Sequence, residues 1–310
     1  MTGFEGSRPA SHEAGYTLIE LIIATALLLI VSASVFNAMQ QVGHVNGTVH
    51  NRSEMHAGVR NATELLQQEI GQAGRVATSQ AMWLTVPVAA NPLAVQIVGV
   101  NAITGLFVGE KLVVDAGANQ ETVTVTAINA LGPTISGIFK NTHLLNVPIT
   151  VHGGFSAGVV PTTTLNGSTA TTLKIFGDIN SDGNLVYVEY TCDIGAGNLY
   201  RNSMAFDAGA KAPPTIAQVL LNNIQPNPGG APCFTYQQQT VTGTAFVTDV
   251  AITLTVQTER PDQVTGLFQT ETKALLNVSP RNVFQVWQMA SLNVNDRVQP
   301  TPASVTALLP

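Results

Sequence analysis

Oxygen-bearing side chains at alternate positions of one short segment could coordinate a cation. Asp178, Asn180 and Asp182 precede Gly183 in the pattern D-x-N-x-D-G, and Glu189 occupies the twelfth position of the same window. Carboxylate and amide oxygens at these positions are the ligands of the EF-hand calcium loop, and the glycine allows its sharp turn. The segment is therefore a candidate calcium site, to be judged by the elements around it.

The residues that follow favour a strand, which argues against a complete EF-hand. An EF-hand needs a helix after the loop, so that its last glutamate returns to the ion. In the strand-like run from Leu185 to Tyr190, at about 3.3 Å per residue, Glu189 would lie roughly 16 Å beyond Asn184 and could not share an ion with Asp178. Two interpretations stay open. The three preceding side chains and the Asn184 carbonyl hold calcium in a hairpin loop, or the residues form the tight turn that Asn, Ser, Asp and Gly favour.

The chain has two cysteines, Cys192 and Cys233. An even count in an exported chain predicts one disulfide, and a pair of buried free thiols is the alternative. The bond would close a loop of about 40 residues, which is worth on the order of 4 kcal/mol in the chain-entropy model.

Catalytic signatures are missing from the sequence. The six histidines form neither H-x-x-x-H nor H-E-x-x-H, and the chain contains no phosphate loop or dinucleotide fingerprint. Only 10% of the residues are charged, the net charge is -6, and the few basic residues are scattered. We therefore expect no enzymatic activity, no certain cofactor other than the candidate calcium, and no nucleic-acid partner.

The first forty residues carry the strongest functional signal. Gly15 and Tyr16 are followed by Thr-Leu-Ile and Glu20, and then by an apolar run from Leu21 to Phe36. As a helix, the 21 residues from Tyr16 to Phe36 would be about 32 Å long, enough to cross the hydrocarbon core of a bilayer. Glu20 is the only charge in this span. A carboxylate in hydrocarbon costs several kcal/mol, so it marks a functional site.

The order of these features resembles the type IV prepilin signal of pilins and type II secretion pseudopilins. In an ordinary secretory signal the cleavage site follows the apolar run, whereas Gly15 precedes it. The resemblance implies that a prepilin peptidase cuts after Gly15, that the new amino terminus of Tyr16 is methylated, and that Glu20 serves in filament assembly. Its carboxylate can meet the positive amino terminus of a neighbouring subunit, because a paired charge is tolerable in low dielectric where an unpaired one is not.

The elements that must position these residues predict an α+β fold. We expect a long amino-terminal helix, with a membrane-spanning half and an exported half, packed on an antiparallel β-sheet head with an inserted β-rich module. Apolar residues recur at helical spacing up to about Val76. Gly43, Gly47 and Gly58 weaken the middle of the helix and predict a kink or local melting. Gly71 and Gly74 suggest its end.

Strand patterns dominate the rest of the chain. The clearest is Glu121 to Ile128, which alternates strictly, and Val247 to Thr258 places four aliphatic side chains on one face. The expected boundaries are a leader over 1–15, the helix over 16–76, a β-rich region with an inserted meander over 77–152, a linker over 153–172, a carboxy-terminal antiparallel domain over 173–298 and a loose tail over 299–310.

The helix from Arg52 to Arg75 and the late segment Pro280 to Val283 resemble the PilW/PulJ group of minor pilins and pseudopilins. The resemblance implies a structural subunit that primes, caps or decorates a type IV pilus or a type II secretion pseudopilus. Its partners would be other subunits, the prepilin peptidase and the inner-membrane assembly platform. The head would be periplasmic before assembly and part of a periplasmic or surface filament afterwards. The alternative is a membrane-anchored surface adhesin or calcium-dependent binding protein that never polymerises.

Overall fold

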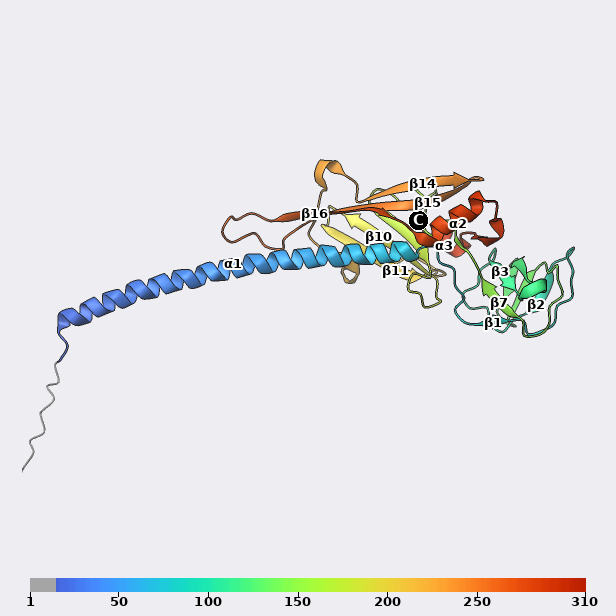
Figure 1. The fold of residues 1–310 in the computed structure, drawn as a ribbon, viewed down its shortest axis with the longest axis horizontal. Coiled ribbons are helices and arrows are strands. Elements are labelled where there is room, and N and C mark those ends of the chain that lie inside the picture. Colours follow the sequence, from blue (N-terminus) through green and yellow to red (C-terminus); the bar gives the residue numbers. More distant parts are fainter. Residues whose placement is uncertain (1–14) are drawn as a thin grey trace, which may run out of the picture.

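The computed structural model describes residues 15–310, the side chain of Leu276 excepted. Residues 1–14, which form most of the expected leader over 1–15, lie outside this range. Helix α1 (Leu18–Gln72) has 55 residues, and its amino-terminal half projects far from the head (Figure 1). Thr17 caps its start. After the helix Gly74 adopts a φ of 80°, a left-handed conformation that glycine permits. The helix is uninterrupted through Gly43, Gly47 and Gly58, so the expected kink or melting is not observed.

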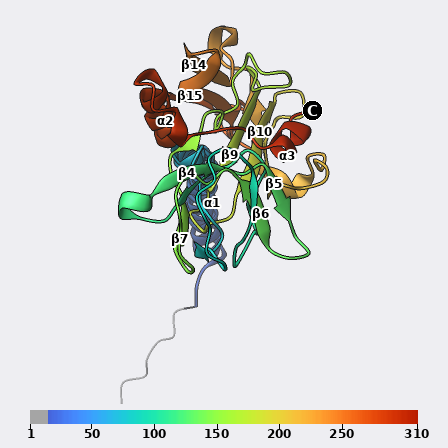
Figure 2. The ribbon, with the colours of Figure 1, turned by 90° about the vertical axis from the view of Figure 1, so that its right-hand side faces the viewer.

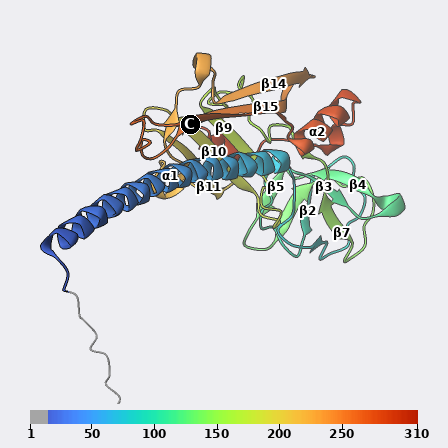
Figure 3. The ribbon, with the colours of Figure 1, turned by 60° about the vertical axis from the view of Figure 1, so that its left-hand side comes forward.

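The carboxy-terminal half of α1 packs on the head because it carries an apolar stripe. Val59, Ala62, Leu66 and Ile70 are buried, at the three- and four-residue spacing of one helix face. They form one hydrophobic core with the inner residues of two sheets. Figure 3 shows α1 running along the strands.

Both sheets of the head are antiparallel. The first has the order β12-β11-β10-β9, from β9 (Thr172–Gly177), β10 (Val186–Asp193), β11 (Asn198–Ala205) and β12 (Val219–Leu221). The second has the order β13-β15-β14, with β16 also paired to β15; its strands are β13 (Ile224–Gln225), β14 (Phe234–Val241), β15 (Thr244–Gln257) and β16 (Thr270–Val278). The face of β15 that carries Val250, Ile252, Leu254 and Val256 is buried, as its alternation predicts.

The inserted region forms a β module with a hydrophobic core of its own, made of residues between Met82 and Ile149. One sheet has the order β1-β7-β3-β4 and the other β2-β6-β5. The strands are β1 (Met82–Trp83), β2 (Gln96–Gly99), β3 (Lys111–Val114), β4 (Glu121–Thr124), β5 (Ala127–Asn129), β6 (Thr134–Gly137) and β7 (Pro148–Val151). The module lies at the end of the molecule opposite the start of α1 (Figures 1 and 2). The expected strand Glu121 to Ile128 is divided between β4 and β5, which belong to different sheets.

The segments expected to be a linker and a loose tail are packed structure. In 153–172, β8 (Gly154–Phe155) pairs with β17 (Val298–Gln299), and Phe155 is fully buried. In the tail, α3 (Ala303–Leu308) buries Val305 and Leu308 in a core shared with Phe155. The carboxy-terminal domain also contains α2 (Arg281–Ser291), whose Val283 and Val286 are buried. The expectation failed because proline and threonine density suggested loops, whereas a few aliphatic residues were enough to fix the segments by burial.

Candidate assembly site and its supporting head

Glu20 lies at the first turn of α1 and its carboxylate turns back toward the start of the helix. The backbone N–H and the hydroxyl of Thr17 both donate to Glu20 Oε2 at 2.9 Å, and the Glu20 N–H donates to Thr17 Oγ1 at 3.3 Å. This reciprocal arrangement is a capping box, which satisfies free N–H groups at the helix start.

The capping box brings the carboxylate close to the position where cleavage would create a charge. A cut after Gly15 would leave an ammonium group on Tyr16, the residue directly before Thr17. Glu20 accepts from the Thr17 N–H, so its carboxylate is held one residue from that group. The site can therefore pair a negative side chain with an amino terminus, its own or that of a neighbour. Gly15, Tyr16 and Glu20 are all exposed.

The apolar half of α1 has no partner among residues 15–310. Its large side chains are exposed from Tyr16 to Phe36, although they are among the most hydrophobic of the sequence. α1 is the one helix, among residues 15–310, that is long and apolar enough to cross a membrane. Such a surface requires a lipid environment or other apolar helices.

The buried half of α1 is fixed to the head by a polar contact that the sequence did not reveal. Glu69 is buried, and its carboxylate accepts from Tyr190 Oη at 2.5 Å, from Arg201 Nε at 3.0 Å and from Arg201 Nη2 at 2.5 Å. Burial, and next the adjacent Glu69 carboxylate, raise the pKa of the Tyr190 hydroxyl, which therefore remains a donor. The sequence does contain an indication of this contact, since the charged residue Glu69 occupies the same helix face as the apolar residues Leu66 and Ile70.

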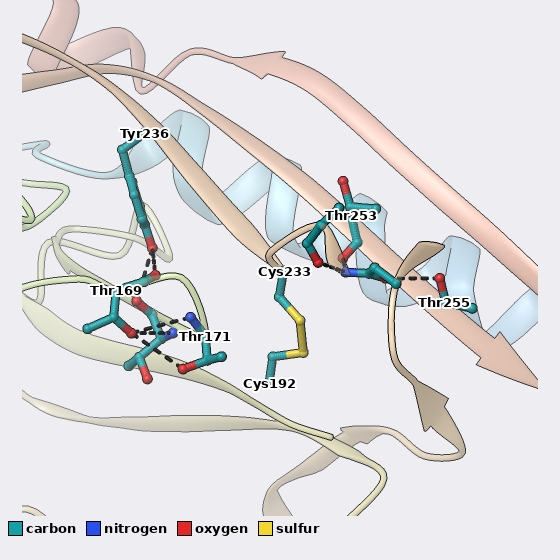
Figure 4. The surroundings of a disulfide bond; sticks show 10 residues. Thr169, Thr171, Cys192, Cys233, Tyr236, Thr253 and Thr255 are labelled. Carbon is teal, nitrogen blue, oxygen red and sulfur yellow. Dashed lines mark hydrogen bonds between the residues drawn. A yellow bond between two sulfur atoms is a disulfide. The ribbon is translucent and has the colours of Figure 1, made fainter. Parts of the chain in front are cut away.

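The predicted disulfide between Cys192 and Cys233 is present. Cys192 lies on β10, and Cys233 directly precedes β14, so the bond joins the two sheets of the head (Figure 4). Both residues are buried. Beside the bond, the Tyr236 hydroxyl donates to the carbonyls of Thr169 and Thr172 at 3.0 Å each.

The candidate calcium segment forms the turn between β9 and β10. Asp178 is buried, and its Oδ1 accepts from the N–H groups of Asp182 at 3.0 Å and Gly183 at 3.3 Å. Its Oδ2 lies 3.4 Å from Nε of Arg75, so the guanidinium supplies the positive charge that a calcium ion would otherwise provide. Asp182 Oδ1 accepts from the N–H of Asn184 at 2.9 Å. The two carboxylates thus organise the backbone of the turn, and these contacts support the turn interpretation.

The other oxygens of the window do not converge on a site. Asn180 is exposed. Glu189 lies on β10, where its carboxylate is 3.0 Å from Nζ of Lys211 and 3.7 Å from Nζ of Lys174. Within the described part of the chain, no three His, Cys, Asp or Glu side chains are grouped as metal ligands.

The inserted module contains a buried polar cluster that had no motif in the sequence. The imidazole of His143 is fully buried, with Nδ1 at 3.1 Å from Asp115 Oδ2 and Nε2 at 2.7 Å from Glu121 Oε1. Glu121 also accepts from the N–H groups of Lys140 and Asn141. The hydrogen bond from His143 is the main reason why the pKa of the Asp115 carboxyl lies below its usual range. The cluster joins the end of β3, the start of β4 and the segment around His143, which gives it a structural role.

Comparison with known proteins identifies one feature of the chain. Residues 10–36 match a family model described as the prokaryotic N-terminal methylation motif. No curated protein and no solved structure shows a significant match to the chain. The matched segment contains Gly15, Tyr16 and Glu20 and ends with the apolar run at Phe36. The chain therefore carries a prepilin-type N-terminal methylation motif, consistent with a type IV pilin-like protein.

Proposed function

We propose that this protein is a minor pilin or pseudopilin, a structural subunit that primes, caps or decorates a type IV pilus or a type II secretion pseudopilus. The observation that carries the proposal is the methylation motif at residues 10–36. It is supported by Glu20, which lies in the capping box of an apolar helix that no other part of the described chain covers. Trimming after Gly15 would then expose the amine that the carboxylate of a neighbouring subunit neutralises.

The shape of the molecule supports a sparse position in the filament. The head combines two sheets with an inserted module, and the module projects at the end opposite the membrane helix (Figure 1). A bulky head is difficult to repeat at every position of a helical filament, whereas at a tip it has free space. The resemblance of the helix to the PilW/PulJ group points in the same direction.

In this proposal the helix spans the inner membrane before assembly and the head is periplasmic. After processing by a prepilin peptidase, other subunits would pack around the apolar half of α1, with the assembly platform at the membrane. Burial in such a bundle accounts for the exposed apolar side chains, because nothing within residues 15–310 covers them.

Substitution of Glu20 by alanine tests the proposal. The Glu20→Ala protein should be trimmed after Gly15 and remain in the inner membrane, but its amount in sheared filaments should fall at least tenfold, because the amino terminus of the neighbour loses its partner. Immunoblots of membrane and filament fractions, with mass spectrometry of the amino terminus, give the result.

Glu64→Ala is the matched control, since Glu64 is an exposed glutamate on the same helix. It should enter filaments normally. Normal incorporation of Glu20→Ala, or a native protein that retains residues 1–15 and lacks the methylated amino terminus, would contradict the proposal. Unchanged function of a protein that never enters filaments would favour the anchored adhesin instead.

A further inference from the structure

The loop between β15 and β16, residues 258–269, leaves the head and follows α1 toward its apolar half. Figure 1 shows it as the part of the head that extends furthest in this direction. Two contacts fix it to the helix. Thr48 Oγ1 donates to Asp262 Oδ2 at 2.7 Å, and Gln263 Oε1 contacts Nδ1 of His44. His44 and Thr48 are half-buried, whereas Val45 and Val49 beside them are exposed.

The loop has a defined internal structure. Asp262 Oδ1 accepts from the N–H groups of Val264 at 2.9 Å and Thr265 at 2.7 Å. The Asp262 N–H donates to the Leu267 carbonyl, and the Gly266 N–H donates to the Asp262 carbonyl. The hydrogen bond from Thr48, followed by those within the loop, lowers the pKa of the Asp262 carboxyl to about 2. The carboxylate therefore stays ionised and keeps its hydrogen bonds to Thr48 and to the backbone of the loop.

Beside exposed polar residues such as Gln263 and Thr265, the loop exposes three large apolar side chains. Val264 is 75% exposed, Leu267 is 69% exposed and Phe268 is 48% exposed. Three large apolar side chains held outward by an ordered loop do not contribute to the core of the head. They require a partner outside the chain.

The position of the loop along α1 identifies that partner as a lipid surface. Before assembly Glu20 has no neighbouring subunit, and an unpaired carboxylate is least costly at the inner boundary of the bilayer. From that position the uncharged residues 21–39 would span about 29 Å, close to the thickness of the hydrocarbon core. His44 then lies about 7 Å above the hydrocarbon, and the headgroup layer of one leaflet is about 5–7 Å thick. The loop, fixed at His44, is thus held at the level of the headgroups.

We propose that Val264, Leu267 and Phe268 rest in the lipid headgroup region of the bilayer that holds α1, and so fix the height of the head above the membrane before assembly. The proposal rests on the membrane insertion of α1 in the proposed function, but not on filament assembly. Apolar side chains on a fixed loop suit this layer, because they can bury part of their surface among the headgroups.

Spin labelling of the full chain in phospholipid vesicles tests the contact. Single substitutions Val264→Cys, Leu131→Cys and Leu28→Cys receive a nitroxide, and power saturation compares access of oxygen, which enters lipid, with access of a water-soluble nickel chelate. Leu131 is fully exposed on the turn between β5 and β6 of the distal module, which makes it the matched aqueous control. Leu28 lies within the apolar run and reports insertion of the helix.

The oxygen-to-nickel ratio at position 264 should be severalfold higher than at position 131 and lower than at position 28. A ratio at 264 equal to that at 131 would overturn the contact while the label at 28 still reports an inserted helix. Protection of position 264 from both reagents would overturn it as well, since it would indicate a protein partner. A water-exposed label at position 28 would overturn membrane anchoring itself, and the lipid contact with it.

Discussion

Glu110 is a single residue whose burial sets a pH dependence for the whole chain. Its side chain is fully buried near the junction of the module and the head, and its Oε2 accepts from the Phe107 N–H at 3.2 Å. Its Oε1 has no hydrogen-bond partner among the residues that the structure describes. Burial raises the pKa of the carboxyl from 4.5 to about 8. The folded chain therefore holds a proton that the unfolded chain releases near pH 4.5.

The consequence for stability has a definite sign. Between pH 4.5 and about 8 the folded state binds one more proton than the unfolded state, so this residue makes stability fall by about 1.4 kcal/mol per pH unit. The stability that protonated Glu110 contributes is fully present below pH 4.5 and is lost as the pH rises to about 8.

The variant Glu110→Gln should remove this dependence. We expect the same free energy of unfolding as the wild type at pH 4, and a gain on the order of 4 kcal/mol at pH 8, because the amide needs no proton. Urea unfolding at both values of pH measures the difference. If the free energies of unfolding of the wild type and the variant differed by the same amount at every pH, the raised pKa of Glu110 would be contradicted.

Glu69 provides the second prediction at this scale. Glu69→Leu should lower the free energy of unfolding by about 3 kcal/mol, because it leaves the Arg201 guanidinium and the Tyr190 hydroxyl without their acceptor. Glu64→Leu, at an exposed position five residues earlier, should change stability by no more than about 0.5 kcal/mol. Chemical unfolding gives the free energy of unfolding of both variants. Equal losses in the two variants would show that the contact of Glu69 with Arg201 and Tyr190 does not stabilise the protein.

At the level of elements, the head depends on the link between its two sheets. The disulfide joins β10 to the start of β14 across 41 residues of sequence. The double variant Cys192→Ser with Cys233→Ser should lower the free energy of unfolding by about 4 kcal/mol, because the open loop has more conformational freedom when unfolded. Non-reducing urea unfolding gives the value, and the reduced wild type should match the variant. A stable double variant would mean that the shared core alone joins the sheets.

At the level of the whole molecule, the module and the head are separate cores connected at one place. The chain leaves the head after α1 and returns at β8, where the Phe155 N–H donates to the Gly74 carbonyl at 2.9 Å. Phe107 of the module packs on Phe155 and Phe206 of the head, with ring centres 5.8 and 6.4 Å apart. The module is thus attached through a small aromatic contact and through Gln299, whose side chain bonds the backbone of Lys111.

Two core substitutions should separate these units. Leu112→Ala, in the module core, should increase hydrogen exchange mainly in residues 82–151, and Leu254→Ala mainly in the head. Each leaves a cavity and costs about 3 kcal/mol locally. Because α1 packs on the head alone, we expect Leu112→Ala to enter filaments and Leu254→Ala to enter them poorly. Equal exchange of both units in both variants would show a single cooperative core.

The sequence determined the features that depend on local pattern. The apolar run after Gly15, the position of Glu20, the alternation of β15 and the pairing of Cys192 with Cys233 could all be predicted, because each follows from residue type and spacing. The tertiary structure decided the rest. It brought Arg201 into hydrogen-bond contact with Glu69, which lies 132 residues earlier in the chain. It also divided the alternating segment after Glu121 between two sheets and packed the carboxy-terminal tail into a core of the head. These outcomes depend on burial against distant segments, and local sequence contains no information on which segments will meet.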